Sequence, residues 1–519
     1  MSARLELPLA AGARLAGSAA AAPGRNAVAT LLGEARRMVL ASAVAGNPSA
    51  SALACVGDGD ALLFACPRMS RAAAQLELNA AAQALVLDER GQAVLELSGY
   101  CRELRDALAR RDALARFAGR LPAQVLDDLA GEAPGQYALL RLVPVRASVP
   151  GPSGASPQAW LDFPQNAPRS SALALGAFGR NLRLWVRAVR APFFTAAVVP
   201  MLLGAAVARR AMPAADWSWS MFAWTLVGAV LAAAGTNLIN DYGDSRSGAD
   251  ECNPVGGNPF TGGSRMIQLG LLAPWQMLLA SVLCFVATMG IGLHINALLS
   301  GSALALTPLL GIGVLGCVLG VAYTVGPFAL SYRGFGEVAV ALGFGPVIVM
   351  GSSYALAGAA GVAWPWQASL LASVPVALFI LLVLWINQFQ DAPADSASGK
   401  RNWVVRVSER PDGSFDFGAA FVAYTALNLA GFAAIALLGV LGWLRPQLAT
   451  PWAWIALLAL PLFLRARAAA HAWNARWRDP AADRAGLPFQ LLPVNAMTIG
   501  VHLAGGLLLA AAYVLGAMR

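Results

Sequence analysis

The chain of 519 residues is 58% hydrophobic and 13% charged, and it carries a net charge of +9. Soluble domains average about 45–50% apolar and about 25% charged residues, so this composition excludes a wholly soluble protein. The basic residues are scattered in loops between apolar segments, which is typical of orientation signals and of contacts with anionic lipids. We therefore expect a lipid bilayer as a partner and no nucleic acid.

The cysteines and histidines do not form a metal or disulfide pattern. The six cysteines include no CxxC pair, and His294, His471 and His502 are far apart in the sequence. They predict neither a zinc site nor a disulfide framework. Residues 1–26 lack a charged start followed by a clean apolar core, so we predict a disordered N-terminus and no signal peptide.

Residues 27–150 predict a small domain of strands with interspersed helices. Short segments such as ARRMVLASAV and AVLELSGYC are typical of strands, and GDGD at 57–60 is typical of a hairpin turn. Helices are expected at 71–81 and 105–129. Many strands with a few helices indicate a barrel with added α elements. The Pro-, Ser- and Gly-rich segment that follows, 151–180, predicts a linker.

The order of these pieces resembles the FMN-binding split barrel of the pyridoxamine-phosphate-oxidase-like and haem-utilisation-like families. The similar segments are ARRMVLAS, CPRMSRAAAQLELNAAAQALVL and LELSGYCREL. The resemblance implies that Arg68, Ser70 and Arg71 meet the phosphate of an FMN cofactor. The alternative is a vestigial barrel, in which the two arginines are simply solvated.

Residues 181–519 predict a membrane domain. A transmembrane helix needs about 20 apolar residues. Nine segments qualify, the eighth being short: 193–209, 221–240, 274–294, 299–322, 336–358, 366–388, 417–443, 452–465 and 493–517. We therefore expect a multi-domain protein, with an α+β split barrel followed by an all-α polytopic bundle of about nine transmembrane helices. Basic residues gather on one side of this topology, so the positive-inside rule predicts an inner (cytoplasmic) membrane protein with a cytoplasmic N-terminal domain.

The second and sixth predicted helices end in acidic segments, NLINDYGDSRSGAD and WINQFQDAPADSASGKR, on the same predicted side. Asn240 and Asp244 are spaced i, i+4, as are Asn387 and Asp391, and then Asp391 and Asp395. This spacing stacks the side chains on one face of each helix. Carboxylates crowded in this way repel each other unless cations lie between them. Oxygen ligands of this kind suit Mg²⁺, which commonly binds a few carboxylates together with substrate phosphates.

Basic residues accompany these acids in the loops on the same side. Arg265, Lys400 and Arg401 are suited to anionic oxygens. Acids, a divalent cation and bases at a membrane surface predict a diphosphate whose lipid tail enters the bilayer. The alternative is that the Asp residues merely cap helices and lie in water. A transporter is a further alternative, but transporter ion sites lie near the midplane of the membrane, whereas these acids lie at helix ends.

From about Leu184 onward the chain resembles the UbiA-type membrane prenyltransferases, and most of all the branch that prenylates 1,4-dihydroxy-2-naphthoate in menaquinone synthesis. The similar segments are VRAVRAPFFTAAVVPMLLG, NDYGDSRSGAD, TGGSRMIQLGLL, AYTVGPFALSYRGFGEVAVALGFGPVIVMGSSY and NQFQDAPADSASGKR. Gly248 stands where many members of the family have a third acid, and Asp250 follows two residues later. That departure leaves open which acid binds metal.

The resemblance implies an Mg²⁺-dependent enzyme that transfers a polyprenyl group from a polyprenyl diphosphate to an aromatic acceptor. Asp244, Asp391 and Asp395 are the expected catalytic residues. The metal contacts that it implies are Asn240, Asp241, Asp244, Asp250, Asn387, Asp391 and Asp395. The residues that it implies for the diphosphate are Arg265, Lys400 and Arg401.

Four further residues are candidates for contacts with the acceptor or with the developing allylic cation. Tyr323 and Tyr332 could face the cation through their rings, although a tyrosine at a helix end is commonly an interfacial anchor. Arg190 and Arg333 could position the acceptor, and the alternative for both is a plain positive-inside role. Two other functions stay open: a membrane-tethered flavin-dependent oxidoreductase, and a UbiA-type enzyme with another acceptor such as 4-hydroxybenzoate.

Overall fold

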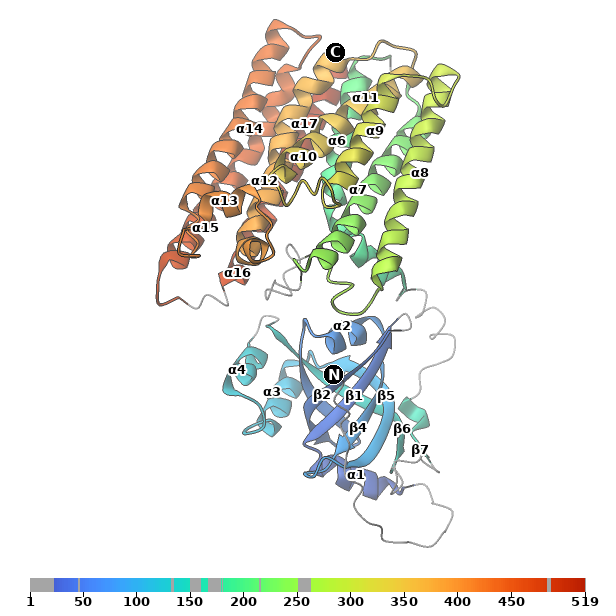
Figure 1. Cartoon of the computed structure of the whole chain (residues 1–519), viewed down its shortest axis with the longest axis vertical. Helices are drawn as coiled ribbons and strands as arrows, with labels where there is room; N and C mark the ends of the chain where they lie inside the picture. The colour runs from blue at the N-terminus through green and yellow to red at the C-terminus, as the bar shows by residue number, and fades with distance from the viewer. Residues whose placement is uncertain are drawn as a thin grey trace. The chain divides into compact units, whose positions relative to one another are not determined.

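The computed structural model describes residues 23–44, 47–131, 135–149, 160–166, 179, 181–213, 216–250, 263–482 and 487–518 (Figure 1). The chain divides into two compact units, residues 1–177 and 178–519. Most of the predicted disordered segment 1–26 and of the predicted linker 151–180 lies outside the described residues.

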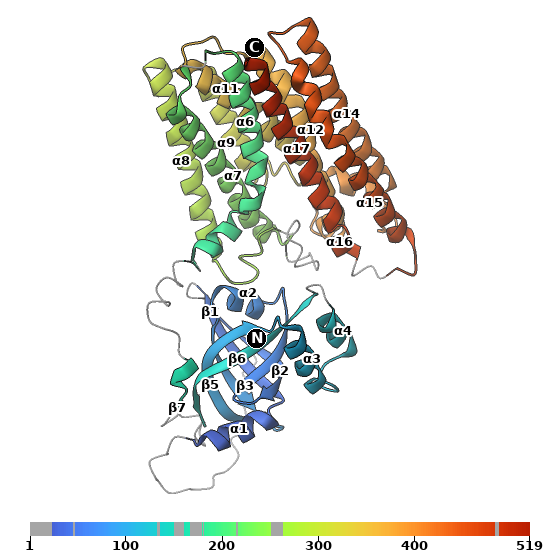
Figure 2. The same ribbon diagram turned by 180° about the vertical axis from the view of Figure 1, so that it is seen from behind.

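The N-terminal unit is a barrel of six antiparallel strands with a short seventh strand at its edge (Figure 2). The strand order is β3-β2-β1-β4-β5-β6-β7, and pairing of β3 with β6 closes the barrel. The strand bounds are β1 Arg37–Val44, β2 Asn47–Asp58, β3 Ala61–Pro67, β4 Ala81–Leu87, β5 Ala93–Glu103, β6 Tyr137–Ser148 and β7 Leu161–Asp162. The barrel predicted from the short strand segments is thereby confirmed, as is the split-barrel fold that the resemblance implied.

Alternation of buried and exposed residues explains these strands. In β4 every second residue is buried, so one face of the strand packs into the barrel interior. The predicted GDGD turn joins β2 to β3, and Gly59 has the positive φ of +66° that such a turn needs. The β7 strand falls in the segment predicted as linker, where Leu161 pairs with Ala147.

Four helices accompany the barrel: α1 Arg25–Glu34, α2 Arg71–Leu78, α3 Ala107–Arg116 and α4 Ala123–Ala130. The single helix predicted at 105–129 is in fact two helices, α3 and α4. Gly119 adopts a φ of +74° between them, and Pro122 precedes α4. Helix α1 was not predicted, although Val28 and Leu32 of this helix are buried in the barrel core.

The C-terminal unit is a helical bundle (Figure 1). Among the described residues, eight segments are long and apolar enough to cross a membrane, and one shorter apolar helix, α9, joins them. The bounds are η2 Ala191–Phe194, α6 Thr195–Arg210, α7 Trp219–Ser247, α8 Pro274–Ser300, α9 Pro308–Ala322, α10 Gly336–Leu342, η4 Gly343–Val347, α11 Ile348–Ala359, α12 Trp366–Ala397, α13 Trp403–Ser408, α14 Gly418–Leu444, η5 Pro451–Ala459, α15 Leu460–Arg478, α16 Leu487–Gln490 and α17 Leu492–Ala517.

Five of the nine predicted helices differ in length from the prediction by six residues or more, and of these the second, third and sixth simply extend further, to Ser247, Ser300 and Ala397. The fourth, predicted at 299–322, is only α9, because Gly301 ends α8 with a φ of +79° and the Thr307 side chain caps the next helix before Pro308. The eighth, predicted as a short helix at 452–465, is the continuous segment Pro451–Arg478. Helices α12, α14, α15 and α17 share the largest apolar core, which fixes α12 in the bundle.

Candidate active site

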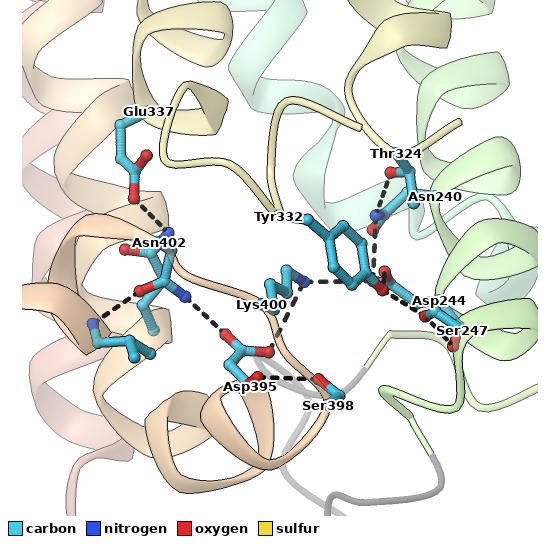
Figure 3. A network of polar contacts seen from close by, with 12 residues as sticks. Asn240, Asp244, Ser247, Thr324, Tyr332, Glu337, Asp395, Ser398, Lys400 and Asn402 are labelled. Carbon is cyan, nitrogen blue, oxygen red and sulfur yellow. Dashed lines mark hydrogen bonds and ion pairs between the residues drawn. The ribbon is translucent and has the colours of Figure 1, made fainter. Parts of the chain in front are cut away.

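The acidic ends of α7 and α12 meet around one lysine (Figure 3). The Lys400 Nζ lies 3.5 Å from Asp244 Oδ2 and 3.7 Å from Asp395 Oδ1. Both carboxylates are buried, with 7% exposure each. Burial alone would lower the pKa of the Lys400 ammonium, but Asp244 and Asp395 raise that pKa well above its usual value. The two predicted acidic motifs therefore converge, and a cation lies between them.

Hydrogen bonds fix the orientation of the α7 side chains. Asn240 Nδ2 donates to Asp244 Oδ2 at 3.1 Å and to Thr324 Oγ1 at 2.8 Å. Tyr332 Oη donates to Asp244 Oδ1 at 2.9 Å and also contacts the Ser247 hydroxyl. Since both donor positions of the Asn240 amide are used, its carbonyl oxygen remains for a ligand.

A second pair of acids, Asp241 and Asp250, lies around Gly263. A Cβ at Gly263 would lie 2.8 Å from Asp241 Oδ1 and 3.3 Å from Asp250 Oδ2, so both carboxylates face the space that a side chain would fill. The Ser264 N–H donates to Asp241 Oδ2 at 3.1 Å, whereas Asp241 Oδ1 is buried and has no hydrogen-bond partner within the described part of the chain. Burial, reinforced by the charges of Asp244 and Asp241, raises the pKa of Asp250 to about 8.

On α12, side chains from other elements orient the second motif. Asn402 Nδ2 donates to Asp395 Oδ2 at 2.7 Å. Asn495 of α17 is fully buried, and its Nδ2 donates to Asn387 Oδ1 at 2.6 Å. The amide oxygen of Asn387 is thus engaged, unlike that of Asn240. Asp391 also lines the cavity between the two helix ends.

Two cavities adjoin each other at this place. The polar cavity is lined by Arg190, Asn240, Asp244, Ala249, Asp250, Gly263, Tyr323, Ser331, Gly336, Leu384, Asn387, Gln388, Asp391, Asp395 and Lys400. The second cavity, of about 220 Å³, runs between mostly apolar side chains of α6, α7, α9, α10, η4 and α12. Five residues line both: Arg190, Asn240, Tyr323, Leu384 and Asn387. A polar head and an apolar tail of one molecule could therefore occupy the two cavities together.

Several predicted residues lie beside the polar cavity rather than in its wall. Arg265 donates to the backbone oxygen of Asp250 at 2.8 Å. Arg401 forms an ion pair with Glu409, and Arg333 is exposed, with its backbone oxygen accepting from Arg406. The ring of Tyr332 lies 5.6 Å from the Lys400 ammonium, so this tyrosine contacts the acidic cluster directly.

Two residues were not predicted from the sequence: Gln388, which lines the polar cavity, and Glu337 behind it. Glu337 Oε1 accepts from Gln388 Nε2 at 3.0 Å and from the Trp403 N–H at 2.8 Å. Both side chains are buried, with 8% exposure for Gln388 and 0% for Glu337. The available signal was a polar residue directly after Asn387 in an apolar helix, because intramembrane polar residues are functional by default.

In the barrel, two of the three residues predicted for a flavin phosphate are engaged by their own domain. Arg68 forms an ion pair with Glu103, and this ion pair outweighs burial and lowers the pKa of Glu103. The Ser70 hydroxyl caps α2 by accepting from the Ala73 N–H, and it also contacts Cys66. Arg71 is the first residue of α2. Within this segment, Arg68 and Ser70 are therefore not free to act as phosphate donors.

The fold and the site define a polytopic membrane enzyme. Its acidic site lies where the ends of α7 and α12 meet, and a small barrel domain forms its N-terminal part. The model of the UbiA prenyltransferase family matches residues 197–492, and the chain belongs to this family. The model of the pyridoxamine 5'-phosphate oxidase family matches residues 25–149. Both resemblances predicted from the sequence are confirmed, as is the assignment as a prenyltransferase.

Named relatives agree with this assignment. A 1,4-dihydroxy-2-naphthoate octaprenyltransferase of Mycobacterium tuberculosis is 31% identical over 54% of this chain and 84% of its own length. A 2-carboxy-1,4-naphthoquinone phytyltransferase of Synechocystis is 27% identical over 66% of this chain and 97% of its own length. Among solved structures, a UbiA homologue from Archaeoglobus fulgidus bound to GPP and Mg²⁺ matches with a TM-score of 0.39 and 13% identity, over 63% of this chain and 99% of that chain.

Proposed function

We propose that this enzyme transfers a polyprenyl group from a polyprenyl diphosphate to a hydroxylated naphthoate, in the biosynthesis of a menaquinone-type quinone. The observation that carries the proposal is the polar cavity between the ends of α7 and α12, which shares five lining residues with an apolar cavity. The names of the relatives support a naphthoate acceptor. The positive-inside pattern supports the inner membrane as the location, with the N-terminal domain in the cytoplasm.

The oxygen donors at the site fit a divalent cation. Asp241 Oδ1 is buried without a partner among the described residues, and Asn240 keeps its amide oxygen unused. No group of three His, Cys, Asp or Glu side chains within the described ranges is already gathered for a metal ion. Mg²⁺ takes oxygen ligands from carboxylates, amides, water and substrate phosphates, so the donors present here suit it.

The proposed Mg²⁺ contacts come from Asn240, Asp241, Asp244 and Asp250 on one side, and from Asn387, Asp391 and Asp395 on the other. When bound, the cation would neutralise charge on the leaving diphosphate. Lys400 adds a positive charge at the same place, with Arg265 and Arg401 nearby. The positive charge of Lys400 stabilises the leaving diphosphate, so that the allylic C–O bond breaks and its electron pair leaves with the diphosphate.

The carbon that loses the diphosphate becomes electron-deficient, and a carbon of the aromatic ring attacks it to form the new C–C bond. The ring regains aromaticity by losing a proton or, for a naphthoate, carbon dioxide. Tyr323 lies at the junction of the two cavities, where its ring can face the allylic carbon. Arg190, at the same junction, can pair with the carboxylate of the acceptor.

Flavin chemistry is left out of the proposed reaction. Arg68 and Ser70 are engaged within the barrel, so the segment predicted for the FMN phosphate does not fit that group as it stands. The barrel is a separate compact unit from the helical bundle that contains the acidic site.

The test is a membrane assay with radiolabelled polyprenyl diphosphate and a panel of aromatic acids, with and without Mg²⁺. We expect transfer to 1,4-dihydroxy-2-naphthoate, loss of transfer when Mg²⁺ is chelated, and little transfer to 4-hydroxybenzoate. Asp244→Ala and Asp391→Ala should each abolish turnover while the protein remains inserted. Retained activity in both variants would refute the assigned metal role, and transfer to 4-hydroxybenzoate alone would refute the assigned acceptor.

A further inference from the structure

Gln388 carries an unused hydrogen-bond acceptor in the wall of the polar cavity. The side chain is 8% exposed, and its Oε1 is buried without a partner in the described part of the chain. A buried amide oxygen without a donor costs about 1–3 kcal/mol relative to a paired one. Such an atom in a ligand cavity indicates that the ligand supplies the missing donor.

The orientation of this amide follows from its neighbour. Gln388 Nε2 donates to Glu337 Oε1, which also accepts from the Trp403 N–H. A glutamine rotated by 180° would place its own carbonyl oxygen against this carboxylate oxygen, which already accepts a hydrogen bond. The nitrogen of Gln388 therefore faces Glu337, and its buried oxygen is the atom without a partner in the described part of the chain.

Few chemical groups can supply the hydrogen-bond donor that Gln388 Oε1 lacks. A diphosphate at the pH of the cell presents acceptor oxygens, so it cannot satisfy a carbonyl oxygen. A carboxylate presents acceptors for the same reason. Of the groups on the two proposed substrates, only a hydroxyl on the aromatic ring can donate to Gln388 Oε1. Contact of this oxygen with Mg²⁺ is the competing outcome, and it predicts no difference between acceptors that differ only in a hydroxyl.

We propose that Gln388 recognises a ring hydroxyl of the aromatic acceptor, and that Glu337 is the positioning residue that holds the amide in this orientation. The inference rests on the proposed function and adds to it the residue that recognises a hydroxyl of the naphthoate. The hydrogen bond increases the electron density that the hydroxyl oxygen gives to the ring, which favours attack by the ring carbon. No proton passes to the amide in this step.

The experiment compares 1,4-dihydroxy-2-naphthoate with 1-hydroxy-2-naphthoate and 4-hydroxy-2-naphthoate, which each lack one hydroxyl and add no bulk. Equilibrium binding to the purified full-length protein is measured without prenyl donor, and the KM of each acceptor is measured alongside. One of the two single hydroxyls should prove essential. The wild type should bind the analogue lacking that hydroxyl about ten-fold more weakly, the effect of one hydrogen bond.

The Gln388→Met variant keeps the length of the side chain. In this variant that ten-fold difference should disappear, because the substitution and the missing hydroxyl remove the same hydrogen bond. The KM for polyprenyl diphosphate should not change. Glu337→Gln retains an oxygen that can accept from Gln388 and should preserve the difference, whereas Glu337→Leu should reduce it. Gln83→Met, at an exposed position of β4 in the barrel, is the matched control and should behave like the wild type.

Wild-type protein that transfers a prenyl group yet binds all three acceptors equally well would overturn the inference, whatever the variants do. A full ten-fold difference retained in Gln388→Met would overturn it as well. A wild type that transfers no prenyl group to any of the three would instead overturn the proposed function.

Discussion

Replacement of Lys400 by methionine tests the arrangement of charges at the centre of the site. The ammonium group lies within 4 Å of two carboxylates, and its side chain is 15% exposed. Two unit charges about 4 Å apart attract by about 4 kcal/mol at an effective dielectric constant of 20. Burial offsets much of this attraction, and removal of one partner from a buried ion pair costs about 3–5 kcal/mol. We therefore expect Lys400→Met to be clearly less stable than the wild type when Mg²⁺ is absent.

Added Mg²⁺ should narrow this difference in stability, because Lys400 and the divalent cation compete for the same carboxylates. If only a third of the roughly 4 kcal/mol of charge repulsion is relieved, Mg²⁺ binds about ten-fold more tightly to the variant. The assay follows the thermal unfolding of detergent-solubilised protein by tryptophan fluorescence over a series of Mg²⁺ concentrations. Turnover should nevertheless fall, since the variant lacks a cation for the leaving diphosphate.

Lys400→Arg is the control, since it keeps the charge and should keep the wild-type stability without Mg²⁺. The reasoning is refuted if Lys400→Met unfolds at the wild-type temperature without Mg²⁺ and requires the same Mg²⁺ concentration for half of its stabilisation. That outcome would mean that Lys400 does not lie between the carboxylates.

Three further predictions concern other parts of the molecule. Tyr332→Phe removes the hydrogen bond to Asp244, so kcat/KM should fall about five- to ten-fold while the protein stays folded, as steady-state assays would show. Hydrogen bonds from Arg478 and Arg410 lower the pKa of Asp416 to about 2. The stabilisation that Asp416 contributes is present above its unfolded pKa near 4 and is lost as the pH falls toward 2. In Asp416→Asn, the unfolding temperature should therefore change less between pH 5 and pH 3 than in the wild type. A chain lacking residues 1–165 should retain prenyl transfer, because the barrel and the helical bundle are separate compact units, and loss of transfer would contradict this prediction. The full-length protein should purify without the yellow colour of bound flavin, because Arg68 and Ser70 are engaged within the barrel, and a yellow protein would contradict that argument.

Much of the fold could be predicted because two periodicities dominate the sequence. Alternation by two marks the barrel strands, and runs of about 20 apolar residues mark the spanning helices. Helix boundaries were less predictable. The segment between α8 and α9 contains the apolar residues Leu304 and Leu306, so its hydropathy resembles that of the helices on either side. Both side chains are strongly exposed, and the backbone of this segment is not helical. Helix α1 is stabilised by tertiary contacts of Val28 and Leu32, and no local sequence pattern predicts these contacts.

The candidate site was predictable where its residues are close in sequence. The spacing of Asn240 and Asp244, and of Asp391 and Asp395, is enough by itself to place each pair on one helix face. The contacts between distant segments were not predictable. Glu337 and Gln388 are 51 residues apart, and Asn387 and Asn495 are 108 apart, so only the folded bundle brings each pair together.

Lys400 is the one lysine in the sequence, and every other basic side chain apart from the histidines is an arginine. Biosynthetic labelling with lysine that is ¹³C-enriched at Cε would therefore introduce a single lysine side-chain NMR resonance. That resonance would report, in the unmutated protein, on each molecule that enters the space between the two acidic helix ends.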